Sequence, residues 1–120
     1  MSNKLDKILA EISAGELFDK ITILEIKRAK ISNKDKLHDI EKELSTLNST
    51  VKKYIPNQKN ISKYINDLKD INLKLWDIED GKRAAEKNKD FNEKFIELAR
   101  NVYKFNDERA KIKLAINTIL

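Results

Sequence analysis

The chain has 120 residues, of which 40% are hydrophobic and 38% are charged, and it contains only 2 Gly and 1 Pro. So few turn-forming residues exclude a fold of many short strands, because each strand would need its own turn. The hydrophobic residues are too many and too regularly spaced for a disordered chain. We therefore expect a few long helices that form a single helical domain over residues 1–120.

Residues 1–13 open the chain with a weak amphipathic pattern, which predicts either a short separate helix or a flexible arm. The first long helix is predicted over residues 14–31. Ser13 and Glu16 have the spacing of a capping box, and Leu17 begins a regular apolar stripe directly after it.

The second helix is predicted over residues 34–54, where apolar residues recur at intervals of three and four, a pattern typical of a coiled coil. Pro56 ends this helix, because proline disfavours helical backbone in the preceding residue. The third helix is predicted over residues 61–88. It continues through Gly81, since residues 83–87 are strong helix formers; a break at this glycine is the alternative.

The fourth helix, over residues 90–119, has the clearest pattern. Asp90 and Glu93 have capping-box spacing, and the apolar stripe is wider than one neighbouring helix would cover. No segment predicts a strand.

Short connections favour antiparallel packing of consecutive helices. The sequence therefore predicts an all-α fold, an antiparallel helical bundle of three to four helices with a coiled-coil-like hairpin. The turn at Pro56 places the second helix beside the third, with Leu47 near Leu68 and Leu37 near Ile78.

The turn between the third and fourth helices sets their register. If it is centred between residues 88 and 90, residue i of the third helix lies opposite residue 179 − i of the fourth. This register predicts that Trp76 faces Tyr103 and that Glu79 forms an ion pair with Arg100.

The charged residues give a candidate polar cluster. Only four of the 25 basic residues are Arg, and Arg28 and Arg109 occupy stripe positions where a hydrophobic residue is expected. A buried Arg needs a partner, either a carboxylate or an anionic ligand. The candidate cluster comprises Arg28, Trp76, Asp77, Glu79, Asp80, Arg100, Tyr103, Asp107 and Arg109. We interpret it as a set of ion pairs, in which Arg28 reaches Asp77 and Asp80; a ligand pocket is the alternative.

Other classes of site lack their characteristic residues. The net charge of +5 is spread evenly along the chain, which argues against a nucleic-acid partner. No apolar run is long enough to span a membrane, and the absence of cysteine fits a cytoplasmic protein. The single histidine, His38, cannot supply the two Glu-x-x-His pairs of a bundle di-metal site. We expect no metal and no cofactor, since glycine-rich phosphate loops are also missing.

Three sequence blocks, in order, resemble a small bacterial all-helical family of unknown function. They are GELFDKITILEIK at residues 15–27, LWDIED at residues 75–80, and FIELARNVYKFNDERAKIK at residues 95–113. The resemblance implies an all-helical fold and no established activity. Its polar motif residues fall in Asp19-Lys20 and in the second and third blocks.

Two functions from different classes fit these observations. The first is a non-enzymatic interaction or scaffold module that self-associates as a homodimer and could also take a protein partner, because the fourth helix has a surplus of apolar surface. The second is a binder or enzyme for a small anionic ligand, with a polar Arg/Asp/Glu pocket inside the bundle. A structure with all four Arg side chains paired to carboxylates and no cavity favours the first function, and unpaired Arg around a solvent-filled pocket favours the second.

Overall fold

The structure is a computed structural model that describes residues 8–120. It contains four helices, α1 (Ala14–Lys30), α2 (Lys34–Tyr54), α3 (Ser62–Lys87) and α4 (Glu93–Ile119). No strand occurs within residues 8–120, so the all-α prediction is confirmed. Residues 8–13 are not helical, and the remainder of the predicted N-terminal element lies outside the described residues. None of the four helices is both long enough and apolar enough to cross a membrane.

The local sequence signals explain most helix ends. The side chain of Ser13 accepts a hydrogen bond from the backbone N–H of Glu16 at 3.2 Å, as the capping box predicted. Asn33 caps α2 in the same way, and α2 ends at Tyr54, two residues before Pro56. The third helix continues through Gly81 without a break.

The start of α4 differs from the prediction. Asn92, rather than Asp90, caps the helix, because its side-chain oxygen accepts hydrogen bonds from the backbone N–H groups of Lys94 and Phe95 at 3.0 and 3.3 Å. Asp90 instead lies in the turn that follows the end of α3 at Lys87. Lys89 there has a φ of 53°, and the N–H of Asp90 bonds to the carbonyl of Ala85 at 2.8 Å. A positive φ followed by such a hydrogen bond is typical of the C-terminal end of an α-helix.

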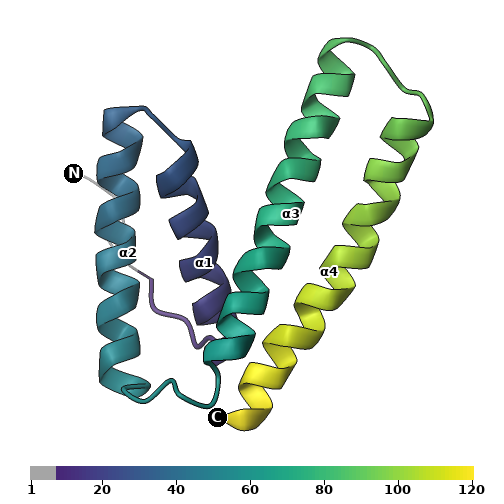
Figure 1. Cartoon of the computed structure of the whole chain (residues 1–120). Helices are drawn as coiled ribbons and strands as arrows, with labels where there is room; N and C mark the ends of the chain where they lie inside the picture. Colours follow the sequence, from purple (N-terminus) through teal and green to yellow (C-terminus); the bar gives the residue numbers. More distant parts are fainter. Residues whose placement is uncertain (1–7) are drawn as a thin grey trace.

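The helices form two hairpins, α1–α2 and α3–α4, which meet at one end of the molecule and diverge at the other (Figure 1). Its principal extents are 48, 45 and 25 Å, so the hairpins form a flat arrangement rather than a cylinder. α1 has the central position, because it packs against α2, α3 and α4. The fold is therefore a bundle around α1 from which the far half of the α3–α4 hairpin projects.

The predicted contact between α2 and α3 is wrong. No Cα atom of α2 lies within 8 Å of a Cα atom of α3, so Leu47 and Leu37 are not opposite Leu68 and Ile78 in a helical hairpin. The segment between the two helices crosses the end of α1, which lies between them (Figure 1). Ile61 in this segment is fully buried, and its side chain helps to fill the core under α1.

The main core lies where the two hairpins meet. Its buried residues come from all four helices and from the segment that joins α2 to α3: Leu17, Phe18, Ile21, Leu24, Ile40, Leu44, Val51, Ile61, Leu68 and Ile116. Residues toward the far end of the α3–α4 hairpin, such as Leu98 and Val102, are only half-buried because they have one neighbouring helix instead of two or three. The apolar stripes thus continue beyond the region where a third helix covers them.

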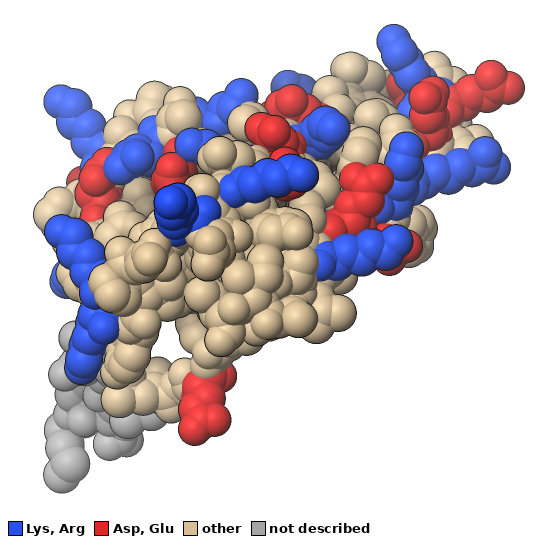
Figure 2. Space-filling view, turned by 60° about the horizontal axis from the view of Figure 1, so that its bottom comes forward, with Lys and Arg blue, Asp and Glu red and all other residues tan. Residues whose placement is uncertain are grey.

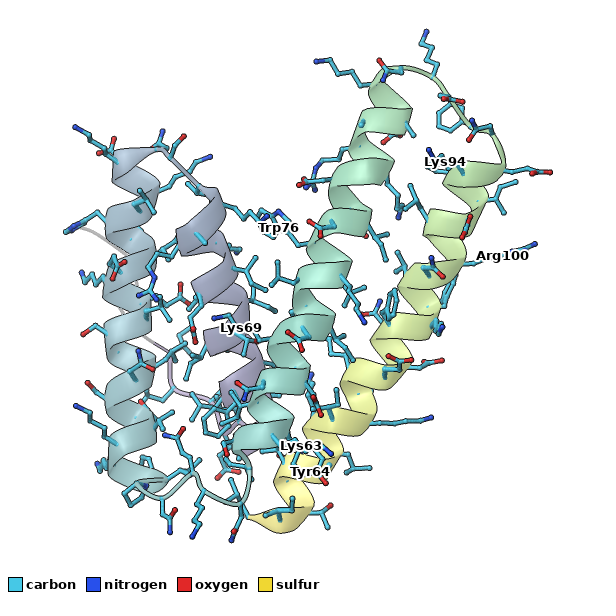
Figure 3. All side chains as sticks on the ribbon, in the orientation of Figure 1. Lys63, Tyr64, Lys69, Trp76, Lys94 and Arg100 are labelled. Carbon is cyan, nitrogen blue, oxygen red and sulfur yellow. The ribbon has the colours of Figure 1, made fainter. Side chains whose placement is uncertain are left out.

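The register between α3 and α4 was predicted correctly, but the facing side chains were not. A Cβ atom at Gly81 would lie 3.1 Å from the Leu98 side chain, and Lys74 Nζ lies 5.3 Å from the ring centre of Phe105. Both pairs satisfy the 179 − i relation. Trp76 nevertheless points from α3 toward α1, whereas Arg100 points away from α3 on the opposite side of α4 (Figure 3).

Candidate functional site

A buried carboxylate lies where α1, α3 and α4 come together. The side chain of Asp19 in α1 is only 3% exposed. Its Oδ1 accepts hydrogen bonds from Arg109 Nε of α4 and from Asn72 Nδ2 of α3, both at 2.9 Å. Its Oδ2 accepts a second hydrogen bond from Arg109, donated by Nη2. The guanidinium therefore binds the carboxylate through two nitrogens, the geometry that arginine favours.

Further polar groups complete this cluster, which we call the Asp19 network (Asp19, Thr22, Asn72, Arg109 and Lys113). The hydroxyl of Thr22 donates to the backbone carbonyl of Asp19 at 2.9 Å and accepts from Asn72 Nδ2 at 2.9 Å. Lys113 Nζ lies 3.8 Å from Asp19 Oδ2 and also pairs with a carboxylate of α1, that of Glu16. In the described part of the chain, no buried side-chain nitrogen or oxygen lacks a hydrogen-bond partner.

The close approach of α1 and α4 at this cluster depends on Gly15. Its N–H donates to Asn117 Oδ1 at 2.6 Å across the helix interface. A Cβ atom at this position would lie 2.5 Å from the backbone carbonyl oxygen of Lys113. Only a residue without a side chain allows the two backbones to lie this close, so Gly15 determines how near Asp19 comes to Arg109.

The electrostatics of the cluster stabilise a permanent ion pair. Burial alone would raise the pKa of Asp19, but the hydrogen bonds from Arg109 and Asn72 and the charges of Arg109 and Lys113 together lower it below its usual value. The same hydrogen bonding to Asp19 raises the pKa of Arg109. At neutral pH the carboxylate holds no proton to donate, and its oxygens already accept hydrogen bonds. The cluster therefore links three helices through one buried ion pair and its hydrogen bonds.

The lowered pKa predicts how stability depends on pH. Because the folded protein keeps Asp19 ionised to lower pH than the unfolded chain, whose ordinary pKa is 3.8, this group contributes stability above that value. The contribution decreases as the pH falls below the unfolded pKa and through the lower folded pKa. We expect the difference in unfolding free energy between wild type and Asp19→Asn to be constant near neutral pH and to shrink in acid. A difference that grows in acid would contradict the assigned ion pair.

The structure separates most of the nine predicted cluster residues. Arg109 alone belongs to the Asp19 network. Asp77, Glu79 and Asp80 lie on α3 beyond the network, and Arg100, Tyr103 and Asp107 lie on α4, where all three are exposed. Arg28 lies near the end of α1 and is also exposed. The predicted cluster is thus not one site, although Trp76, Glu79 and Arg109 line a common cavity.

Two predicted ion pairs are wrong. Glu79 pairs with Lys82 of its own helix at 3.7 Å instead of Arg100, because Arg100 points to the other side of α4. Arg28 pairs with Glu41 of α2 at 3.7 Å instead of Asp77 or Asp80. Asp80 instead pairs with Arg83, three residues along the same helix. The reason is that α1 and α3 diverge toward their C-terminal ends, so Arg28 is closer to α2 (Figure 1).

An open cavity of about 310 Å³ lies in the wedge between α1 and α3, above the Asp19 network. Ile23 and Ile26 of α1 line one side, and Trp76, Glu79 and Arg83 of α3 line the other. Trp76 points into this wedge (Figure 3). The two arginines that reach the cavity, Arg83 and Arg109, already bind the carboxylates of Asp80 and Asp19. The cavity therefore offers mainly apolar surface.

The sequence contained a signal for the residues that were missed. Gly15, Asp19, Thr22 and Ile26 are spaced by four, three and four residues and form a second stripe on the first helix. A charged residue inside such a stripe needs a buried partner of opposite charge. Arg109, which also interrupts an apolar stripe, is that partner, although 90 residues separate the two in sequence.

Comparisons with known proteins give a family for the chain. Residues 8–120 form a four-helix fold around the Asp19 network, and they include no group of three or more His, Cys, Asp or Glu side chains that could hold a metal ion. Residues 8–119 match a family described as a family of unknown function (DUF6165), and the chain belongs to that family. No curated protein and no solved structure matches the chain.

Proposed function

We propose that the protein is a non-enzymatic helical interaction module that associates with a second copy of itself. The observation that carries the proposal is exposed apolar surface along α4. Ile96, Tyr103 and Leu114 there are 48%, 77% and 65% exposed. Large apolar side chains that recur on one helix face and remain uncovered are typical of a protein–protein contact.

The charge distribution also supports an interaction between proteins. On the face drawn in Figure 2, Lys and Arg side chains alternate with Asp and Glu, and a broad area between them carries neither. A nucleic-acid surface would instead gather positive charge. Uncharged area bordered by charges of both signs suits a protein partner.

The alternative, an anionic-ligand site inside the bundle, has less support. Its arginines would need free N–H groups directed into a cavity. Arg28, Arg83 and Arg109 each pair with a carboxylate of the same chain, and the fourth arginine, Arg100, points away from α3 and from the inside of the bundle (Figure 3). The wedge cavity beside Trp76 is mainly apolar. Binding an anion there would break an existing ion pair first, which costs free energy.

One denaturation experiment separates the two functions. A self-associating protein becomes more stable as its own concentration rises, because the dimer is favoured by mass action. We expect the thermal midpoint to rise by several degrees between about 2 and 200 µM protein. We also expect it to stay unchanged when phosphate, citrate or dicarboxylates are added at constant ionic strength.

The opposite pattern would contradict the proposal. A midpoint that does not depend on protein concentration but rises with one anion would identify a ligand binder. Potassium chloride at the same ionic strength is the control for general salt effects, since screening alone changes the strength of exposed ion pairs.

A further inference from the structure

We infer that two copies of the chain pair through the outer faces of their α4 helices, in antiparallel orientation and in one defined register. The inference rests on the proposed self-association and specifies its surface. We define the outer face of α4 by the six residues Ile96, Arg100, Tyr103, Asp107, Ala110 and Leu114.

The six residues form a single straight stripe. Their spacing is four, three, four, three and four, which keeps them on one side of a helix. All six are exposed, and none contributes to the core at the other side of α4. Arg100 points away from α3 (Figure 3). At 1.5 Å per residue, the stripe from Ile96 to Leu114 is about 27 Å long.

The stripe is complementary to itself when a second copy runs in the opposite direction. In the register in which paired residue numbers add to 210, Ile96 meets Leu114 of the second copy and Arg100 meets its Ala110. Tyr103 then meets Asp107, so the phenol hydroxyl can donate to the carboxylate. By symmetry each of these contacts occurs twice, as an interface related by a two-fold axis requires.

Charge selects the antiparallel orientation over the parallel one. In the antiparallel register, Arg100 lies one helical turn from Asp107 of the second copy, and the small Ala110 leaves space for its long side chain. A parallel pair would place Arg100 beside Arg100 and Asp107 beside Asp107. Repulsion between like charges at close range disfavours that arrangement.

One flanking pair agrees with the same register, whereas Lys104 comes beside Lys104 of the second copy at the two-fold axis. Glu97 lies on one edge of the outer face and comes next to Lys111 of the second copy. The contact area of one helix pair is nevertheless small, so we expect a dissociation constant in the micromolar range or weaker, as for contacts below about 1,200 Å².

Disulfide trapping tests the orientation directly. Because the chain contains no cysteine, only the introduced residues can form a disulfide. Ile96→Cys and Leu114→Cys are prepared as separate full-length proteins, one of them labelled with a heavy nitrogen isotope. They are mixed above the dissociation constant and oxidised. We expect a disulfide between the two different variants in at least about tenfold excess over either symmetric disulfide, since like positions lie about 27 Å apart in the antiparallel dimer.

Three other outcomes would contradict the inference, and each identifies a different error. Symmetric disulfides in excess would mean parallel pairing. No disulfide, together with a dimer detected by mass, would mean that the chain associates through another surface and that only the inference fails. No disulfide and no dimer would contradict the proposed function as well.

A charge exchange checks the register independently of cysteine chemistry. Arg100→Asp should weaken the dimer at least about tenfold, and the double variant Arg100→Asp with Asp107→Arg should restore it to within about threefold of wild type. Lys52→Asp on α2 makes the same charge change at an exposed position away from α4 and should leave the dissociation constant unaltered. If the double variant is no tighter than the single one, the register is wrong.

Discussion

Arg109→Met is expected to lower the free energy of unfolding by about 3 kcal/mol, because it leaves the buried carboxylate of Asp19 without its main partner. The substitution keeps most of the side-chain length, so the loss reports the missing ion pair rather than a large cavity. Lys113, at 3.8 Å from Asp19 Oδ2, remains to compensate in part, which limits the effect. Urea unfolding at low protein concentration, where the monomer dominates, measures it.

Two matched variants show whether the effect comes from burial. Arg83→Met removes the same group from an exposed ion pair with Asp80 and should cost less than about 1 kcal/mol. Replacing both partners, with Asp19→Leu and Arg109→Met together, should recover much of the stability lost in Arg109→Met, since no unpaired buried charge remains. Equal losses for Arg83→Met and Arg109→Met would show that the Asp19 network contributes no more than a surface pair.

The second large effect is expected from Gly15→Ala, which should destabilise the fold by about 1–3 kcal/mol. The added methyl group would lie 2.5 Å from the carbonyl oxygen of Lys113, and a backbone atom cannot move aside without shifting α4. Separation of α1 from α4 would also lengthen the Gly15–Asn117 hydrogen bond. Thermal or urea unfolding of the monomer measures the loss.

The other glycine of the chain is the natural control. A methyl group at Gly81 would lie 3.1 Å from the tip of the Leu98 side chain, which can rotate away. Alanine also favours the middle of a helix over glycine by about 1 kcal/mol. Gly81→Ala should therefore be neutral or stabilising. If both substitutions destabilise equally, the close approach at Gly15 is not what positions α1 on α4.

The helices could be predicted because their limits are local. Ser13, Asn33 and Pro56 determine helix ends through contacts within a few residues, and the periodicity between them is regular. The start of α4 was misplaced because Asp90 and Asn92 both offer capping side chains. The choice between them depends on the hydrogen bonds that end α3, which the spacing of residues in the sequence does not specify.

The arrangement of the helices was harder to predict because it depends on contacts far apart in sequence. A short connection suggested that α2 lies on α3, whereas α1 lies between them. The α3–α4 register followed from the length of the turn, but register does not determine which side chains face each other. Trp76 and Tyr103 occupy opposite positions along the hairpin and still point in different directions, with Tyr103 77% exposed.

Only part of the polar cluster could be predicted, because its partners are far apart in sequence. Arg109 could be recognised as unusual because it interrupts an apolar stripe. Its partner Asp19 could not be assigned, since several carboxylates were compatible with the antiparallel bundle. The assignment required the contact of α1 with α4 that Gly15 allows.

Sedimentation equilibrium of the unmodified chain tests the central claim, self-association, most directly. Between about 5 and 500 µM, the account predicts a reversible rise in the weight-average mass from 14.0 kDa toward twice that value, with no larger species. The same data should fit one dissociation constant at every loading concentration. A mass that stays at 14.0 kDa throughout would contradict the account.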